Sequence, residues 1–446
     1  MANPTRRDFL KTSTVVAAGT ALASSLLPSN LYAAGDDEIK VGLIGCGGRG
    51  TGAIDNVLMS APNVRIVALA DAFQDRADDC AKRIDGFTQK KEVKDLGNKV
   101  DVKGRVFVGL KAYEDLLRTD CNYVILATPP GFRPVHLAAA VAAGKNIFTE
   151  KPVAVDGTGC RVMYEAAEAA KQKNLKVAAG TQRRHQAGYI ETIKRIQGGE
   201  IGDVVALRAY WVNGGPIWHR GDHGDTDLER QIRNWYHYVW LSGDHICEQH
   251  VHNLDVCNWI IGSHPVKCWG QGSRQQLGDK SGEIWDNFDV EFEYANGVHM
   301  FSYCGQIKRD WSSVSEGVHG TKGTANPAGT IQPKGGQMWR YREKAVDPYV
   351  QEHMDLMNAI LGDKELNEGK QVTDSTLTAI MGREASYSGA GVNWEDVLNC
   401  KFTYGPEMLY QNCAKMEYGA FRTLQPPMPS MHNILKDPPM LPLAKV

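Results

Sequence analysis

The sequence predicts an α/β protein with two domains: a doubly wound domain with a parallel sheet, followed by a domain with a large, mainly antiparallel open sheet. Up to about residue 180, short apolar runs alternate with helical stretches, which is typical of βαβ units. Beyond that point, apolar and polar residues alternate, as in a sheet with one solvated face. A chain of 446 residues also exceeds the size of one typical hydrophobic core.

In the first domain, the expected strands are buried apolar runs at residues 39–44, 64–70, 122–127, 146–149 and 176–179. Helices are expected between them at 135–143 and 157–173. The polar interval 83–105 is expected to form an enlarged loop.

In the second domain, alternating runs predict strands at residues 203–212, 288–294 and 298–303. The last two are joined by Ala-Asn-Gly, which favours a hairpin turn. Helices are expected at 348–361 and 375–386. We therefore divide the chain into four parts: a signal segment at 1–34, a nucleotide domain at 36–180, a substrate and oligomerisation domain at 181–425, and a Pro-rich arm at 426–446.

The N-terminal segment reads Thr-Arg-Arg-Asp-Phe-Leu-Lys at residues 5–11 and is followed by a mildly apolar run and by small residues at Ala33 and Ala34. This order resembles a twin-arginine export signal, which implies a periplasmic or otherwise exported protein. The alternative is an ordinary amphipathic helix with a chance arginine pair. The apolar run is too short for a stable membrane span, so we expect none after signal removal.

The overall charge is nearly balanced, with 50 Lys and Arg against 52 Asp and Glu. No basic stripe stands out, so we expect neither a nucleic acid nor an anionic membrane as a partner. The ten cysteines show no CxxC spacing, and twin-arginine substrates fold before export. We therefore expect mostly buried, unpaired thiols.

A glycine-rich turn follows the first expected strand, with the functional positions Gly45, Gly47, Gly48, Arg49 and Gly50. Such glycines permit a tight turn, close approach to a pyrophosphate and close helix packing, as in a Rossmann domain. Asp71 ends the second strand and would accept hydrogen bonds from ribose hydroxyls. That favours NAD over NADP, although Arg76 moderates the preference. The alternative is a glycine turn that binds no nucleotide.

A second signature follows two further strand ends. Thr128 and Pro129 end one strand, His136 lies in the next helix, and Glu150-Lys151-Pro152 follows the next strand. Ligands of doubly wound folds bind at this carboxyl edge of the sheet. We therefore expect Thr128, Pro129, His136, Glu150 and Lys151 to contact the cofactor.

The order and spacing of these motifs resemble those of the Gfo/Idh/MocA oxidoreductase family: G-x-G-x-x-G, A-T-P-P, H, G-K and E-K-P. The resemblance runs from about residue 39 to 179 and continues more weakly beyond. It implies an N-terminal Rossmann NAD(P)-binding domain and a second α/β domain whose open sheet carries substrate residues and subunit contacts, so a homo-oligomer is expected. It also places Lys151 beside the nicotinamide and the substrate hydroxyl.

The segment 243–255 holds the densest group of polar residues, among them Glu248 and His252. The family places an acid and a histidine four residues apart on one helical face, and these two residues match those positions. We assign His252 as the acceptor of the substrate hydroxyl proton. Lys151 would orient the oxygen of the same hydroxyl, and Glu248 would support either residue. Two departures stand out, Glu for the usual Asp and His250 for the usual Gly.

A metal site built from these histidines and carboxylates is the alternative, but it needs a third ligand from elsewhere, so we expect no metal. Arg183 follows the last strand of the nucleotide domain, where the family lines its substrate pocket. Trp235 belongs to a cluster of aromatic and polar residues suited to sugar rings, although packing at the sheet edge would explain at least half of the cluster. We assign Arg183, Trp235 and His250 as substrate contacts.

The predicted function is therefore an NAD(P)-dependent oxidoreductase that acts on CH–OH groups of a sugar or sugar derivative. Export raises the question of how the nicotinamide is reoxidised, which favours a tightly bound cofactor and a closed redox cycle. One alternative is a redox-assisted glycosidase that oxidises, eliminates, hydrates and re-reduces. Another is a catalytically silent sugar- or nucleotide-binding protein on the same scaffold.

Overall fold

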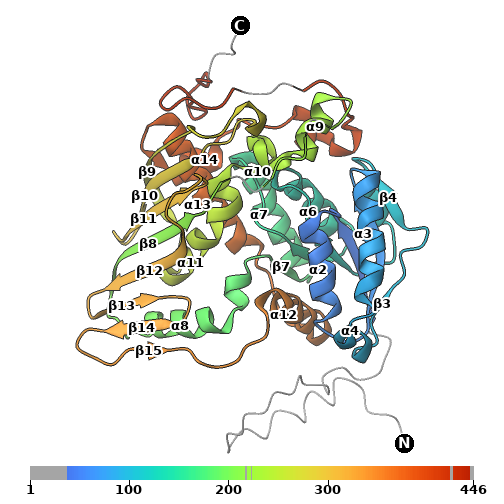
Figure 1. The fold of residues 1–446 in the computed structure, drawn as a ribbon, viewed down its shortest axis with the longest axis horizontal. Coiled ribbons are helices and arrows are strands. Elements are labelled where there is room, and N and C mark those ends of the chain that lie inside the picture. Colours follow the sequence, from blue (N-terminus) through green and yellow to red (C-terminus); the bar gives the residue numbers. More distant parts are fainter. Residues whose placement is uncertain (1–37, 216–217, 222, 422–424, 442–446) are drawn as a thin grey trace, which may run out of the picture. The chain divides into compact units, whose positions relative to one another are not determined.

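The computed structural model describes residues 38–215, 218–221, 223–421 and 425–441 (Figure 1). The predicted signal segment 1–34, with the small residues Ala33 and Ala34 at its end, lies outside the described residues. Among those residues, none of the helices has both the length and the apolar character required to cross a membrane.

The nucleotide domain is built on a seven-stranded sheet in which every pairing is parallel. The strand order is β3-β2-β1-β5-β6-β7, with β4 also paired to β2. Its strands are β1 (Ile39–Ile44), β2 (Val64–Asp71), β3 (Lys99–Val100), β4 (Val106–Val108), β5 (Tyr123–Leu126), β6 (Asn146–Thr149) and β7 (Val177–Ala179). The expected strands and parallel arrangement are confirmed. The central strands β1, β2, β5, β6 and β7 are largely buried and mainly apolar, because both faces of the sheet are covered.

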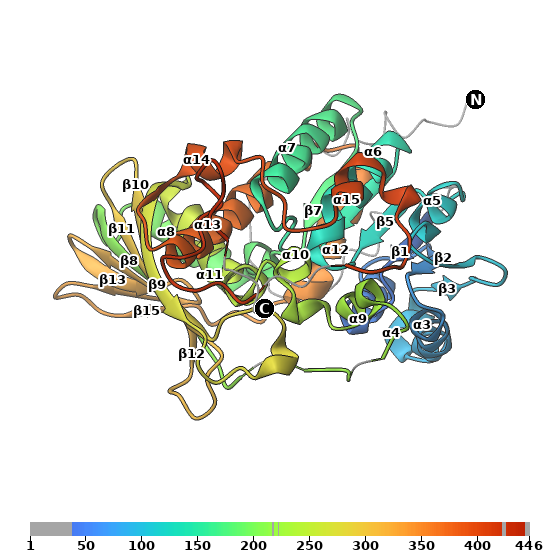
Figure 2. The ribbon, with the colours of Figure 1, turned by 90° about the horizontal axis from the view of Figure 1, so that it is seen from above.

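Helices connect these strands and cover the sheet (Figure 2). They are α2 (Gly48–Leu58), α3 (Gln74–Phe87), α4 (Lys91–Asp95), α5 (Ala112–Leu117), α6 (Arg133–Ala142) and α7 (Gly157–Gln172). The expected loop at 83–105 is wrong: α3 continues into it, and α4 and β3 follow. Ile84 and Val93 are fully buried. These two apolar side chains pack this otherwise polar interval against the rest of the domain.

The second sheet has nine strands in the order β15-β14-β13-β12-β8-β11-β10-β9-β16. They are β8 (Val204–Val212), β9 (Pro265–Ser273), β10 (Asn287–Tyr294), β11 (His299–Gly305), β12 (Ser313–Gly320), β13 (Gly323–Asn326), β14 (Thr330–Pro333), β15 (Trp339–Arg340) and β16 (Val392–Asn393). All pairings are antiparallel except β8 with β11. The expected mainly antiparallel sheet and the β10–β11 hairpin are therefore confirmed.

One face of this sheet packs against α11 (Val251–Ile261) and α13 (Gly369–Ser388), which lie on the same side of it in Figure 2. The other face leaves the aromatic side chains of Trp269, Phe301 and Tyr303 partly exposed. This sheet is thus open on one face, as the alternating sequence pattern predicted.

The long helix α13 is buried along most of its length and also contacts α7 of the nucleotide domain. Its Arg383 is fully buried and pairs with Glu384 at 2.7 Å. The guanidinium also donates to the carbonyls of Gly243, at 3.0 Å, and Val155, at 2.8 Å. Four of the five guanidinium N–H donors find an oxygen, so the charge is tolerated inside the protein, and Arg383 joins three chain segments.

All ten cysteines lie among the described residues and are free, and nine of them are buried. This confirms the expectation of unpaired thiols. In the described part of the Pro-rich arm, the carbonyl of Pro427 accepts a hydrogen bond from Trp285 Nε1 at 2.9 Å, and His432 is buried against Tyr404. The arm packs on its own chain.

Replacing Arg383 by Met should lower the free energy of unfolding by about 3–5 kcal/mol, because Glu384 would stay buried without its partner. Lys370→Met on the same helix removes an exposed pair with Asp374 and should cost less than about 1 kcal/mol. Urea denaturation of the two variants measures the difference. Equal losses would show that the buried pair does not stabilise the fold.

Candidate active site

The turn between β1 and α2 has the geometry of a dinucleotide cradle. Gly45 has a φ of +103°, and a Cβ there would lie 2.6 Å from the Ala127 carbonyl carbon. At Gly50, a Cβ would lie 1.9 Å from the Gly45 oxygen. By contrast, a Cβ at Gly47 or Gly48 would meet no described atom within 4 Å. The outer glycines therefore close the turn, and the inner two leave room for a pyrophosphate at the start of α2.

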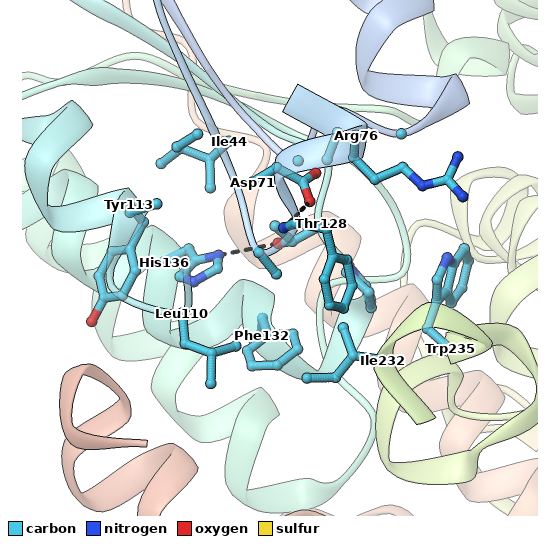
Figure 3. A pocket seen from close by; sticks show the side chains of 18 of the residues that line it. Ile44, Asp71, Arg76, Leu110, Tyr113, Thr128, Phe132, His136, Ile232 and Trp235 are labelled. Carbon is cyan, nitrogen blue, oxygen red and sulfur yellow. Dashed lines mark hydrogen bonds between the residues drawn. The ribbon is translucent and has the colours of Figure 1, made fainter. Parts of the chain in front are cut away.

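A pocket extends from this turn along the carboxyl edge of the parallel sheet (Figure 3). Asp71 lies in it, and its carboxylate accepts hydrogen bonds from the backbone amides of Cys46 at 2.7 Å and Phe73 at 2.9 Å. These bonds fix the carboxylate at the position expected for a ribose contact. Burial raises the pKa of Asp71, although the two amides oppose the shift.

Thr128, Pro129 and His136 line the same pocket. Thr128 Oγ1 lies 3.1 Å from His136 Nδ1. Burial lowers the pKa of His136 to about 3, so the ring is neutral near pH 7. The structure thus brings together Asp71, Thr128, Pro129, His136 and the glycine turn, which the sequence analysis grouped as cofactor contacts.

The side chains of Arg49 and Glu150 engage each other in an ion pair. Arg49 also pairs with Glu352 at 2.9 Å and lies over the ring of Tyr349. Both partners belong to α12 (Pro348–Gly362), so Arg49 ties the cradle to a helix about 300 residues away. Glu352 is fully buried and burial raises its pKa well above the ordinary value. No sequence motif pointed to Glu352, and the predicted cofactor contacts of Arg49 and Glu150 stay predictions.

Lys151 extends from the end of β6 to the second domain. Its Nζ donates to the backbone carbonyl of Glu248 at 2.6 Å and lies 3.4 Å from Glu248 Oε1. Glu248 sits in a π-helical turn, Ile246–His250, immediately before α11. Such turns are rare and often mark functional sites. Burial raises the pKa of Glu248, while the Lys151 ammonium opposes that shift.

His252 occupies the first turn of α11, just past the π-helical turn. Its ring stacks on Trp211 of β8 with centroids 5.8 Å apart. Burial lowers the pKa of His252 well below its ordinary value, and the charges of Lys151 and Arg183 lower it further. The imidazole is therefore neutral and able to accept a proton. Because the π-turn widens the helical repeat, Glu248 and His252 are not the regular α-helical pair that their spacing predicted.

Arg183 lies in the short 3₁₀ turn Gln182–His185 and forms a buried ion pair with Glu316. Its guanidinium carbon is 6.0 Å from the ring centre of Trp211, the residue on which His252 stacks. Asn253, which follows His252, donates to Glu316 at 2.7 Å. Arg183 thus lies close enough to His252 for its charge to lower the pKa of that histidine, and its expected substrate contact stays a prediction. Glu316 was missed because it lies mid-strand, without a motif.

Two further expected substrate contacts, Trp235 and His250, stay predictions. Trp235 lines the nucleotide pocket with Asp71 and Arg76. His250 is fully buried, and its Nε2 lies 2.7 Å from Ser302 Oγ. His250 and His252 belong to the same segment, 243–255, but His250 contacts Ser302 of β11 and His252 contacts Trp211 of β8. Within the described part of the chain, no group of three or more His, Cys, Asp or Glu side chains could hold a metal ion.

The fold and this site define a nicotinamide-dependent oxidoreductase acting on CH–OH groups. The model for the oxidoreductase family with an NAD-binding Rossmann fold matches residues 39–179, and the model for the GFO/IDH/MocA C-terminal domain matches residues 189–326. The chain belongs to the Gfo/Idh/MocA family. Residues 3–23 also match the twin-arginine translocation signal sequence.

Among proteins similar to this chain, inositol 2-dehydrogenase 3 of Saccharopolyspora erythraea is 27% identical over 71% of this chain and 84% of the relative. The scyllo-inositol dehydrogenase of Lactobacillus casei, solved with NAD(H) and scyllo-inositol, has a TM-score of 0.59 and 19% identity, covering 80% of this chain and all of that one. The aldose–aldose oxidoreductase of Caulobacter crescentus, solved with glycerol, has a TM-score of 0.61 and 18% identity, covering 80% of this chain and 99% of that one.

The position of Asp71 predicts the cofactor preference. Asp71→Ser should weaken NAD⁺ binding by about tenfold or more, since a hydrogen bond to a charged group is lost, and should improve NADP⁺ binding, since the 2′-phosphate no longer meets a carboxylate. Asp78→Ser, at an exposed site on α3, is the matched control. Titration of both dinucleotides by calorimetry measures the preference. An unchanged ratio of the two affinities would remove Asp71 from the ribose site.

Proposed function

We propose that this protein oxidises a CH–OH group of an uncharged sugar or cyclic polyol outside the cytoplasm, on a nicotinamide cofactor that stays bound between turnovers. The observation that carries the proposal is the contact of Lys151, at the carboxyl edge of the nucleotide sheet, with Glu248 of the second domain, four residues before His252. The Lys151 charge also lowers the pKa of His252. When bound there, NAD⁺ supplies the acceptor for the hydride that leaves the carbinol carbon.

The chain's own groups account for the proton. A neutral His252 takes the hydroxyl proton as the C–O bond gains double-bond character. An ammonium group has three donors. Lys151 directs its described contacts at Glu248 alone, which leaves a donor for the substrate oxygen. The carbonyl of Glu248 holds the Lys151 Nζ in place, so the oxygen is oriented before proton transfer.

The charge balance favours an uncharged substrate. Lys151 pairs with Glu248, and Arg183 pairs with Glu316. Both of these cations therefore already have a carboxylate partner, so neither is left free to pair with an acidic substrate. Trp211 offers an apolar ring surface next to these polar groups, which suits the alternating C–H and O–H faces of a sugar ring. The names of the similar proteins, inositol and aldose oxidoreductases, support the same substrate class.

Export supports a resident cofactor and a closed redox cycle. A twin-arginine signal carries folded protein across the membrane, so the dinucleotide can travel already bound, and the periplasm is the compartment we infer. Reduction of a second sugar would then restore NAD⁺ without a soluble acceptor. A glycosidase cycle needs a further base, for which His250 or a nearby tyrosine is a candidate, and His250 is fully buried against Ser302. Exchange between two sugars is therefore the preferred cycle.

Lys151→Ala should retain bound dinucleotide and lose sugar-dependent turnover by about 10²–10⁴-fold, since the substrate oxygen loses its orienting donor. Lys171→Ala, at an exposed site on α7, should match the parent. The assay mixes purified protein with pairs of sugars and follows products by mass spectrometry, after released cofactor has been quantified from denatured protein. Full activity of Lys151→Ala would overturn the assignment.

The pH dependence follows from His252. Because its pKa is lowered in the folded protein, it stays an active base until the pH falls well below 6.5, the ordinary histidine value. We expect the acid limb of kcat/KM below pH 6.5, with the rate falling as His252 becomes protonated. Steady-state rates between pH 4.5 and 8, with cofactor content checked at each pH, measure the limb. An acid limb above pH 7 would contradict His252 as the base.

A further inference from the structure

The adenosine half of the dinucleotide pocket has walls from two domains. One wall comes from the end of β2 and the start of α3, with Asp71, Phe73 and Arg76. The other comes from the second domain, where Ile232 and Arg233 of α9 (Asp227–Arg233) and nearby Trp235 line the same pocket. Figure 3 shows Ile232 and Trp235 across the pocket from Ile44. A nucleotide bound at Asp71 would therefore touch both domains.

The second wall consists of two chain segments that are hydrogen-bonded to each other. Thr226 caps the start of α9 by accepting a hydrogen bond from the amide of Glu229. The amide of Leu228 donates to the carbonyl of Gly419 at 3.2 Å, which joins α9 to residues 418–421. Phe421 packs edge-on against Trp240, with ring centres 5.4 Å apart. We call α9, Trp235 and residues 418–421 the clasp.

The clasp closes on the turn between β2 and α3. The Arg233 guanidinium carbon lies 3.8 Å from the ring centre of Phe73, and its Nη1 lies 3.1 Å from Asp75 Oδ1. Tyr418 donates its hydroxyl to the carbonyl of Ala72 at 2.9 Å, and its ring stacks on Phe73 with centres 5.9 Å apart. These contacts hold the residues that follow Asp71, where the adenosine is expected to bind.

We propose that the clasp holds the adenosine end of the dinucleotide and makes the cofactor a resident group instead of an exchangeable cosubstrate. Release requires the second wall to separate from the β2–α3 turn, which breaks the Arg233 and Tyr418 contacts together. This inference rests on the proposed function, because an exported enzyme with a closed redox cycle gains from a cofactor that does not leave. Arg233 and Tyr418 lie outside the Lys151–His252 site, so they control retention and not the chemistry.

The test measures how fast bound NAD⁺ leaves the full mature protein. Protein loaded with isotopically labelled NAD⁺ is chased with excess unlabelled NAD⁺, and the retained label is followed with time. Arg233→Ala removes an ion pair and a ring contact and should speed release by about tenfold. Tyr418→Phe removes one hydrogen bond, keeps the ring, and should speed release by about threefold or more. Arg230→Ala is the matched control, since Arg230 on the same helix pairs locally with Asp227.

Each outcome decides a separate question. Faster release in both clasp variants, with melting temperatures of the cofactor-free proteins unchanged, supports the clasp. Equal release rates in the parent and all three variants overturn it, as does a parent that exchanges NAD⁺ within seconds. A parent that exchanges NAD⁺ rapidly yet oxidises polyols would overturn the clasp alone. A parent that retains NAD⁺ through Arg233 and Tyr418 but oxidises no polyol or sugar would overturn the proposed function alone.

Discussion

The contact between Lys151 and the backbone carbonyl of Glu248 is the interaction on which the site depends. It joins the carboxyl edge of the parallel sheet to the helical segment on the open sheet, so the groups proposed for catalysis in the two domains are linked by a direct contact. The π-helical turn Ile246–His250 makes this possible, because a widened turn alters the backbone hydrogen-bonding pattern of an ordinary α-helix. His252 follows that turn at once, and its position is therefore set by the same irregularity.

Buried charge imposes a second constraint, and the chain meets it by pairing. Arg383 forms an ion pair with Glu384 between the domains. Arg183 forms an ion pair with Glu316 near Trp211, the residue on which His252 stacks. Burying an ion is costly unless a partner and further hydrogen bonds replace water. Pairing thus stabilises the interior. It also supports the proposed preference for an uncharged polyol over an acid, because the two cations already have carboxylate partners. The depressed pKa of His252 follows from the same low-dielectric surroundings.

The proposed chemistry and the proposed clasp involve different residues. Lys151 and His252, proposed for the chemistry, belong to separate domains, and the charge of Lys151 lowers the pKa of His252. At the adenosine end, the clasp brings Arg233 and Tyr418 onto the turn after β2. The proposed retention by the clasp agrees with the proposed export of the folded enzyme, because a bound cofactor can cross the membrane with the protein. Fold similarity to inositol and aldose oxidoreductases does not by itself reveal this division, because similar folds carry different loops.

Features that depend on local chemistry can be predicted from the amino-acid sequence. The glycine turn, Asp71 at a strand end and Lys151 after β6 were predictable, because strand–turn–helix motifs and parallel strand ends follow short-range rules. Tertiary structure alone decided which distant residues meet. Trp235 lies at the nucleotide pocket, and Glu352 pairs with Arg49 across about 300 residues. Sequence periodicity does not predict such contacts, because they depend on how the two domains pack and on which charged residues pair inside the protein.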